Sequence, residues 1–122
     1  MNNRETGAGK ETLAAEYLAA NGMRIVERNF RSRQGEIDLI GYHNGYLVFV
    51  EVKYRRTEQF GSPQEAVDFR KQRKICRVAD YYRYRHRLGE GCPVRYDVVA
   101  FQGTQISWIQ NAFYHVYSHK SI

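Results

Sequence analysis

Cysteine is scarce in this 122-residue sequence, and long apolar runs are absent from it. The two cysteines, Cys76 and Cys92, cannot form a disulfide framework, so we expect reduced thiols in a cytoplasmic protein. No apolar run approaches the roughly 18 residues that a membrane-spanning helix needs, and residues 1–5 lack the apolar stretch of a secretion signal. We therefore expect neither export nor association with a membrane.

Positive charge is what the sequence has in excess. Nineteen Lys and Arg against thirteen Asp and Glu give a net charge of +6 and an isoelectric point near 9.5. Between Val52 and Arg87, eleven basic residues stand against four acidic ones. The hydrophobic share of 43% and the charged share of 26% are ordinary for a globular protein. We expect one domain over residues 1–122, with 1–8 and 115–122 as flexible tails and a basic region suited to nucleic acid.

Hydrophobic patterns and turn residues predict seven elements. Strong helix formers predict a first helix that ends at Gly22, and Asn44-Gly45 is the strongest short signal for a hairpin between two apolar strands. Ser62 and Pro63 favour the cap and first turn of a second helix. The expected helices are 9–21 and 62–85, and the expected strands are 23–30, 36–42, 46–54, 94–101 and 105–109. The order αβββαββ predicts an α/β or α+β domain.

The hairpin brings four charged residues to one place. A two-residue loop at 44–45 fixes which residues of the two strands face each other. Asp38 then lies opposite Glu51. Glu36 lies opposite Lys53 on the same face, because side chains two residues apart in a strand point the same way.

Two carboxylates that face each other across a hairpin repel. Their Cβ atoms are about 5 Å apart, and two charges at that distance repel by on the order of 3 kcal/mol at an effective dielectric near 20. Burial in apolar strands adds a further cost. A divalent cation between the two carboxylates would turn this repulsion into a net attraction, because Mg²⁺ prefers clustered oxygen ligands. Glu11, which borders the apolar stripe of the first helix, could supply another carboxylate.

Three other arrangements are consistent with the same residues. Asp38 and Glu51 could form structural ion pairs with basic residues of the second helix, or one of them could hold a proton. A bulge in the hairpin would shift the register and separate the two carboxylates. The residues alone therefore leave open whether this is a metal site or a set of structural charges.

Motifs along most of the chain resemble those of one protein family. The matching segments are 9–11, 17–18, 28–31, 35–40, 48–53, 95–99 and 108–113. Two of them, GEIDLI at 35–40 and VFVEVK at 48–53, resemble the paired signature of the PD-(D/E)XK nuclease superfamily. Within that superfamily, the chain resembles the YraN-type family of bacterial proteins over about residues 9–113. Ile37 stands where the superfamily's name has proline, a residue that is not a ligand.

The resemblance implies a restriction-endonuclease-like α/β fold, with a mixed central sheet flanked by helices. It implies Mg²⁺ or Mn²⁺ bound by Asp38 and Glu51 with the backbone carbonyl of Val52. Glu11 matches a position near the metal in archaeal Holliday-junction resolvases, and Lys53 matches the lysine that orients or activates the attacking water. The implied activity is endonucleolytic hydrolysis of phosphodiester bonds in DNA. Branched or structured DNA is the expected substrate, and a homodimer is an expected assembly.

The basic region supplies the expected contacts to nucleic acid. Its members are Arg55, Arg56, Arg70, Lys71, Arg73, Lys74 and Arg77. Lys71 falls on the mainly apolar face of the second helix, and we expect its amine to extend outward, with contact to a phosphate in the site as the alternative. In the segment 81–87, aromatic residues alternate with basic ones, and we expect its tyrosines to pack on the core.

Two other functions are consistent with the same sequence. A non-catalytic module on this fold would hold DNA or RNA without cutting it, and a structural adaptor would use its basic face to bind an acidic protein. Metal-dependent cleavage distinguishes the nuclease from both. Salt-sensitive binding to nucleic acid distinguishes the module from the adaptor.

Overall fold

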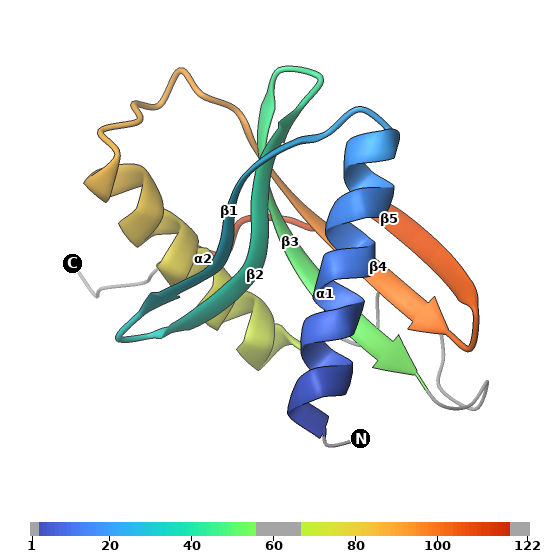
Figure 1. Ribbon diagram of the computed structural model, residues 1–122. Coiled ribbons are helices and arrows are strands. Elements are labelled where there is room, and N and C mark those ends of the chain that lie inside the picture. Colours follow the sequence, from blue (N-terminus) through green and yellow to red (C-terminus); the bar gives the residue numbers. More distant parts are fainter. Residues whose placement is uncertain (1–2, 56–66, 118–122) are drawn as a thin grey trace.

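The computed structural model describes residues 3–55 and 67–117, and Figure 1 shows how they are arranged. Two helices and five strands follow one another in the predicted order αβββαββ. The elements are α1 (Asn3–Ala20), β1 (Arg24–Ser32), β2 (Gly35–His43), β3 (Tyr46–Arg55), α2 (Phe69–Arg85), β4 (Val94–Gln102) and β5 (Gln105–Phe113). Neither described helix combines the length and the apolarity that crossing a membrane requires.

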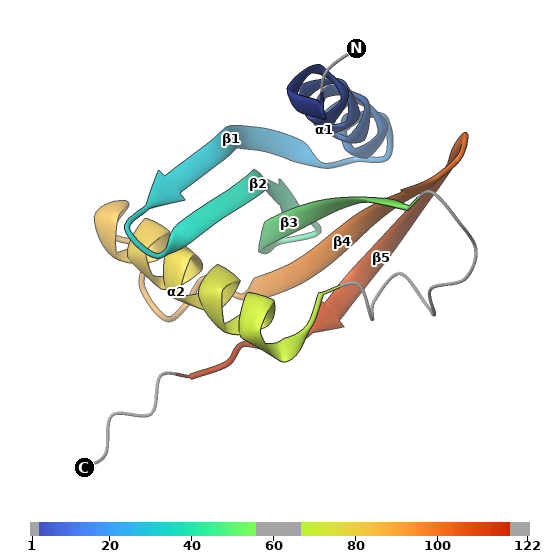
Figure 2. The ribbon, with the colours of Figure 1, turned by 90° about the horizontal axis from the view of Figure 1, so that it is seen from below.

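The five strands form one mixed sheet that lies between the two helices. The strand order is β1-β2-β3-β4-β5, and neighbours are antiparallel except for β3 and β4, which run parallel. A parallel pair needs a crossover, and α2 lies in the connection between β3 and β4. Figure 2 shows α1 on one face of the sheet and α2 on the other. The mixed sheet flanked by helices is therefore confirmed.

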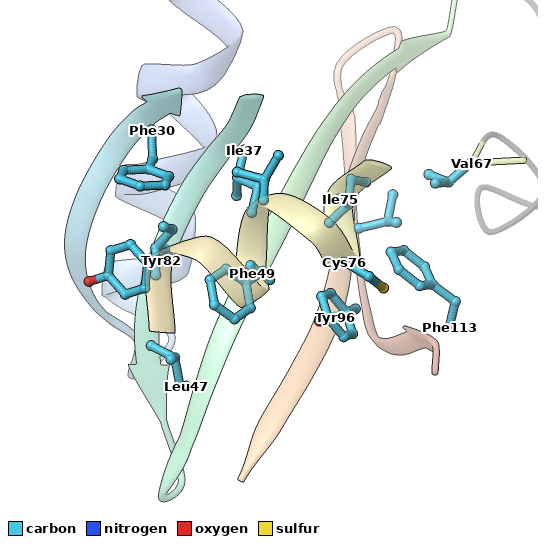
Figure 3. Packing of buried hydrophobic residues seen from close by; sticks show 14 of the residues in the cluster. Phe30, Ile37, Leu47, Phe49, Val67, Ile75, Cys76, Tyr82, Tyr96 and Phe113 are labelled. Atoms are coloured by element: carbon cyan, nitrogen blue, oxygen red, sulfur yellow. The ribbon is translucent and has the colours of Figure 1, made fainter. Parts of the chain in front are cut away.

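Each face of the sheet packs a separate hydrophobic core. Figure 3 shows the core on the α2 side, where Phe49 and Tyr96 of the sheet lie with Tyr82 of the helix. On the other face, Leu18 of α1 is fully buried against strand residues. Strand β3 contributes alternate residues to both cores, which explains why 47–50 is apolar at every position. Burying each such side chain stabilises the fold by about 1.5–3 kcal/mol.

The β2–β3 hairpin forms as predicted, but its pairing is shorter than expected. Asn44 and Gly45 have φ angles of 51° and 84°, as a tight two-residue turn requires, and the predicted register holds through the pair Leu39↔Val50. The ladder ends there. Asp38 accepts a hydrogen bond from the Val52 N–H at 2.8 Å, so a side chain takes the place of the next main-chain pair.

Glu36 does not face Lys53, contrary to the register argument. In the described pairing it lies opposite Arg31 of β1, and its Oε2 is 3.1 Å from the Arg31 Nε. The prediction was wrong because β2 stops pairing with β3 after Leu39 while it still pairs with β1. The four charged residues expected on one face of the hairpin therefore do not face one another across β2 and β3, because Glu36 pairs with β1 instead.

The helix boundaries also differ from the expected ones. Helix α1 begins at Asn3 rather than Gly9, so residues 3–8 belong to a helix instead of a tail. Helix α2 begins at Phe69, and its N-cap is Asp68, which accepts a hydrogen bond from the Lys71 N–H at 2.8 Å. Aspartate is as good an N-cap as serine. The cap expected at Ser62 lies outside the described residues.

The segment after β5 contacts helix α2. The Tyr96 hydroxyl lies 2.6 Å from the His115 Nδ1, and the His115 Nε2 lies 3.3 Å from an oxygen of Asp80. The Val116 N–H donates to the Cys76 sulfur at 3.3 Å. Residues 115 and 116, which were expected to begin a tail, are therefore bound to the domain.

A buried ion pair ties β4 to β5. Asp97 is 1% exposed and accepts four hydrogen bonds. Arg95 donates two of them through its Nε and Nη2, both at 2.9 Å. The Trp108 indole N–H and the Asn111 backbone N–H donate the others, at 2.8 and 2.9 Å. The Arg95 Nη2 also lies 2.9 Å from the His43 Nδ1, so the pair extends to β2.

Substitution of Asp97 by asparagine is expected to lower the free energy of unfolding by about 3 kcal/mol. The change leaves the Arg95 guanidinium buried without its counter-ion, and breaking a buried pair in this way is strongly destabilising. Urea unfolding followed by circular dichroism measures the loss. The matched control is Asp80→Asn, which removes an exposed carboxylate and should cost less than about 1 kcal/mol. Equal losses in the two variants would contradict a special role for the buried pair.

Candidate functional site

Three carboxylates from two elements meet beside strand β2. Glu11 of α1 and both Glu36 and Asp38 of β2 each offer an oxygen, and these oxygens lie within 4.8 Å of one another. All three side chains are partly buried. We call Glu11, Glu36 and Asp38 the carboxylate cluster. The sequence argument placed Glu36 beside Lys53 and missed it as a member, although its position two residues before Asp38 was the available signal.

Packing and one polar contact fix Glu11 at the sheet. Ala14 and Leu18, three and seven residues further along α1, are fully buried on the sheet, so the helical stripe holds Glu11 at its border. Arg28 of β1 donates a hydrogen bond to the Thr12 hydroxyl at 2.9 Å, next to Glu11 in the chain. The position predicted for Glu11 from the helical periodicity is thus the observed one.

Asp38, a member of the carboxylate cluster, has a strongly raised pKa. Burial raises its pKa from 3.8 to about 8, and the neighbouring Glu51 carboxylate adds to the rise. The hydrogen bond from the Val52 N–H acts in the opposite direction. Glu11 and Glu36 contribute smaller increases. Asp38 consequently holds a proton at neutral pH unless a cation compensates its charge.

Glu51 lies beside two lysines. The Lys53 Nζ is 3.7 Å and the Lys71 Nζ is 3.8 Å from the same Glu51 oxygen, and Glu51 is only 7% exposed. Burial raises the pKa of Glu51, while the two ammonium groups lower it. Lys71 comes from the first turn of α2 and reaches the site instead of extending outward, which corrects the expectation from its helical position. The structural ion pairs that the sequence left open exist here, with lysines as partners.

The carboxylate cluster is consistent with a hard divalent cation. Two oxygens on opposite sides of Mg²⁺ at 2.1 Å are about 4.2 Å apart, close to the observed limit of 4.8 Å for the cluster. Every donor is an oxygen, as Mg²⁺ and Mn²⁺ prefer. Burial and the neighbouring Glu51 carboxylate raise the pKa of Asp38, so the charged form of Asp38 is costly at this place and a cation would offset that cost.

Most of the predicted site residues lie together. Asp38 lies close enough to Glu51 for the Glu51 carboxylate to be the second largest cause of the raised pKa of Asp38, after burial. Glu11 joins Asp38, and Lys53 joins Glu51. The Val52 N–H contacts Asp38, and the role implied for the Val52 carbonyl stays a prediction. Asp38 and Glu51 were expected as a directly facing pair of the β2–β3 hairpin, but the described ladder ends at Leu39↔Val50, one pair before them.

The predicted basic contacts are partly described. The exposed members on α2 are Arg70, Arg73, Lys74 and Arg77. Arg56 and the side chain of Arg55 lie outside the described residues. Among the tyrosines of the segment 81–87, only Tyr82 packs in the core as expected, whereas Tyr81 and Tyr84 are 40% and 82% exposed.

Comparisons with known proteins place the chain in a family. Residues 10–101 match the family model described as "Uncharacterised protein family UPF0102". A UPF0102 protein of Lachnoclostridium phytofermentans is 50% identical over 113 residues, which cover 93% of this chain and 96% of that protein. A UPF0102 protein of Symbiobacterium thermophilum is 48% identical over 118 residues, with coverage of 92% and 98%.

One solved structure shows a weaker likeness. It is the crystal structure of a repair endonuclease from Pyrococcus abyssi, with a TM-score of 0.48 and 19% sequence identity. The match covers 85% of this chain but only 41% of that one. The family itself follows from the sequence matches, and the chain belongs to UPF0102, the YraN-type family whose motifs its sequence carries.

Proposed function

We propose that this protein is a nuclease that uses Mg²⁺ or Mn²⁺ to hydrolyse phosphodiester bonds in DNA. The observation that carries the proposal is the meeting of the carboxylate cluster with Glu51 and two lysines at one place on the sheet. Carboxylates hold the cations of phosphoryl-transfer sites, and ammonium groups offset the charge of the reacting phosphate. The PD-(D/E)XK motif resemblance supports the same chemistry.

The carboxylates are the proposed metal ligands. Asp38 and Glu51 would bind the cation together with the Val52 carbonyl, and Glu11 and Glu36 lie where they can add ligands or position a bound water. A cation held there would supply Lewis acidity toward a phosphate oxygen and would lower the pKa of a water bound to it. The partial burial of the carboxylates strengthens their attraction for it, because charges interact more strongly away from bulk water.

The two lysines have separate proposed roles. Lys53 is partly exposed and extends from the same strand as Glu51, so it can orient the attacking water and offset charge as the phosphate reacts. Lys71 approaches Glu51 from α2 and is more exposed than Lys53. It is placed to bind a phosphate oxygen of the substrate beside the reacting group. The ion pairs with Glu51 hold both amines at the site before a substrate arrives.

The exposed basic face of α2 is the proposed DNA-binding surface. Arg70, Arg73, Lys74 and Arg77 recur at intervals of three or four residues along one side of the helix, which begins at the site through Lys71. Contacts of these side chains with phosphates would give affinity and orientation without a preference for base sequence. Selection among DNA molecules would then depend on shape, as branched substrates require.

A cleavage assay tests the proposed activity. Purified protein is incubated with plasmid, single-stranded and four-way-junction DNA in the presence of Mg²⁺, Mn²⁺ or EDTA. Metal-dependent cutting supports the nuclease. Tight, salt-sensitive binding without cutting would support the non-catalytic module instead, and absence of binding would support the adaptor. Light scattering of the same preparation tests the homodimer that the resolvase resemblance implies.

The double substitution Arg73→Ala and Arg77→Ala is expected to weaken DNA binding and its salt dependence. Each lost phosphate contact lowers the slope of log affinity against log salt by about one, so the double variant should lose about two. Fluorescence anisotropy between 50 and 200 mM salt measures the slope. Arg24→Ala is the control, because Arg24 is an exposed arginine of β1 that lies over the Tyr42 ring. An unchanged slope in the double variant would place the DNA elsewhere.

A further inference from the structure

Two adjoining hollows lie between the β1–β2 turn and the second half of α2. Their volumes are about 310 and 360 Å³. The smaller is lined by Tyr81 of α2, by Arg31 and Ser32 at the end of β1, and by residues 33–34 of the turn. The larger is lined by residues of β1 and by Arg85 and His86 at the end of α2. Arg31 lines both, and Figure 1 shows the β1–β2 turn beside α2.

Tyr81 gives the smaller hollow an aromatic wall. Its side chain is 40% exposed, and its ring centroid lies 6.1 Å from that of Phe30, with the rings inclined by 30°. Phe30 is buried and packs edge-on against Tyr82 at 5.1 Å. The Tyr81 ring is therefore supported by the core on one side and accessible in the hollow on the other. A supported, accessible ring is suited to stacking against a nucleobase.

The charge of the hollows suits a phosphate backbone. Among the described residues that line them, three arginines stand against one acidic residue, Glu27. Arg31 and Arg33 are exposed. The Arg31 Nε contacts Glu36 at 3.1 Å, and a guanidinium has further donors on its two Nη atoms. An aromatic wall flanked by guanidinium groups is the combination with which proteins hold single-stranded nucleic acid.

The hollows are adjacent to the proposed cleavage site. Arg31 contacts Glu36, which is itself a member of the carboxylate cluster. Along α2, Tyr81 follows Arg70, Arg73 and Arg77 on the exposed side at helical spacing. Lys71 and Tyr81 are ten residues apart, or about 15 Å along the axis at 1.5 Å per residue. Roughly four stacked nucleotides span that length.

We propose that the hollow beside Tyr81 is a subsite for unpaired DNA, in which Tyr81 stacks against a base while Arg31 and Arg33 bind its phosphates. A duplex cannot use this subsite, because its bases are already stacked on each other. This subsite deepens the proposed nuclease function. Only the statement that the bound strand leads to a cleavage site rests on that function. The substrate class is then DNA with a single-stranded arm next to the scissile bond.

Binding in EDTA tests the subsite without cleavage. A fluorescent oligothymidylate and a duplex of equal length are titrated with wild type, Tyr81→Ala and Tyr81→Phe. We expect Tyr81→Ala to weaken single-strand binding about tenfold, with less than a twofold effect on the duplex. Tyr81→Phe keeps the ring and should stay within twofold of wild type. Tyr84→Ala is the matched control, because Tyr84 is 82% exposed and is not among the described residues lining either hollow.

A second readout reports stacking directly. 2-Aminopurine placed in the single strand should lose fluorescence on binding wild type and keep it with Tyr81→Ala. If Tyr81→Ala does not fold, as judged by circular dichroism, Arg33→Ala replaces it and should lower the single-strand salt slope by about one. Equal losses on single strand and duplex, or no loss in either variant, would overturn the subsite. Tyr81-dependent quenching in a protein that never cleaves DNA would retain the subsite and refute only the nuclease.

Discussion

Asp38→Asn is expected to slow metal-dependent DNA cleavage by about a thousandfold. Asp38 belongs to the carboxylate cluster, and Glu51 also raises its pKa, so Asp38 is the proposed ligand that joins the two groups. The amide removes the charge that a cation needs. Its carbonyl oxygen can still accept the hydrogen bond that Val52 donates at 2.8 Å, so the fold should persist. Single-turnover cleavage with Mn²⁺ measures the rate, and calorimetry measures Mn²⁺ binding.

A comparison with Lys53→Ala separates metal binding from chemistry. Lys53 contacts Glu51 at 3.7 Å but carries no negative charge, so its removal should leave Mn²⁺ binding measurable. Cleavage should still fall by about a hundredfold to a thousandfold, because a positive group beside the reacting phosphate is lost. Asp80→Asn changes an exposed carboxylate of α2 and should cleave at the wild-type rate. Wild-type cleavage by Asp38→Asn would remove Asp38 from the proposed active site.

Local signals predicted the hairpin and part of the candidate site. Asn44-Gly45 favours a tight turn by itself, so the register followed from the sequence as far as Leu39↔Val50. The predicted pairing beyond that point was wrong, because a strand in the middle of a sheet has two neighbours and can stop pairing with one of them first. β3 continues to pair with β4 through Arg55↔Gln102 after its ladder with β2 has ended. No pattern within the β2–β3 segment specifies where a ladder stops.

Glu36 and Lys71 depend on tertiary contacts that periodicity does not contain. Glu36 joins the carboxylate cluster because α1 brings Glu11 to β2, and it contacts Arg31 because β1 pairs on its other side. Lys71 reaches Glu51 from the first turn of α2, which begins at Phe69 after the N-cap Asp68. The resemblance of motifs implies the proposed chemistry of the site, whereas the tertiary structure decides which carboxylates form the cluster.

The exposure of Tyr81 shows a similar limit. Tyr81, Tyr82 and Tyr84 have the same side chain and differ only in their angle around α2. Tyr82 faces the sheet, where Phe30 and Phe49 pack against it. The sequence predicted this helix and its apolar face, but the breadth of that face is set by how closely the β1–β2 turn approaches α2. Tyr81 lies at this boundary, partly supported by Phe30 and partly exposed.

The stability of the metal-free protein is expected to fall as the pH rises from about 4 to about 8. The pKa of Asp38 is 3.8 in its ordinary state and about 8 in the folded protein. Between these values the folded state holds a proton that the unfolded state has lost, so the contribution is complete below pH 4 and disappears as the pH passes 8. A difference of this size corresponds to on the order of 5 kcal/mol. Glu51, whose pKa burial also raises, acts in the same direction.

Urea unfolding in EDTA at pH 5, 6.5 and 8 measures how the free energy of unfolding depends on pH. The fluorescence of Trp108, the only tryptophan in the sequence, reports the unfolding. Asp38→Asn cannot titrate, so its stability should vary much less with pH and should exceed that of wild type at pH 8. Mn²⁺ added to wild type at pH 8 should restore stability, because a ligand that binds only the folded state stabilises it and the ionised carboxylates are the form that binds. Parallel pH curves for the two proteins would mean that Asp38 is ionised at neutral pH without a cation. In that case neighbouring lysines would already neutralise the site, and the physical reason for a metal there would be lost.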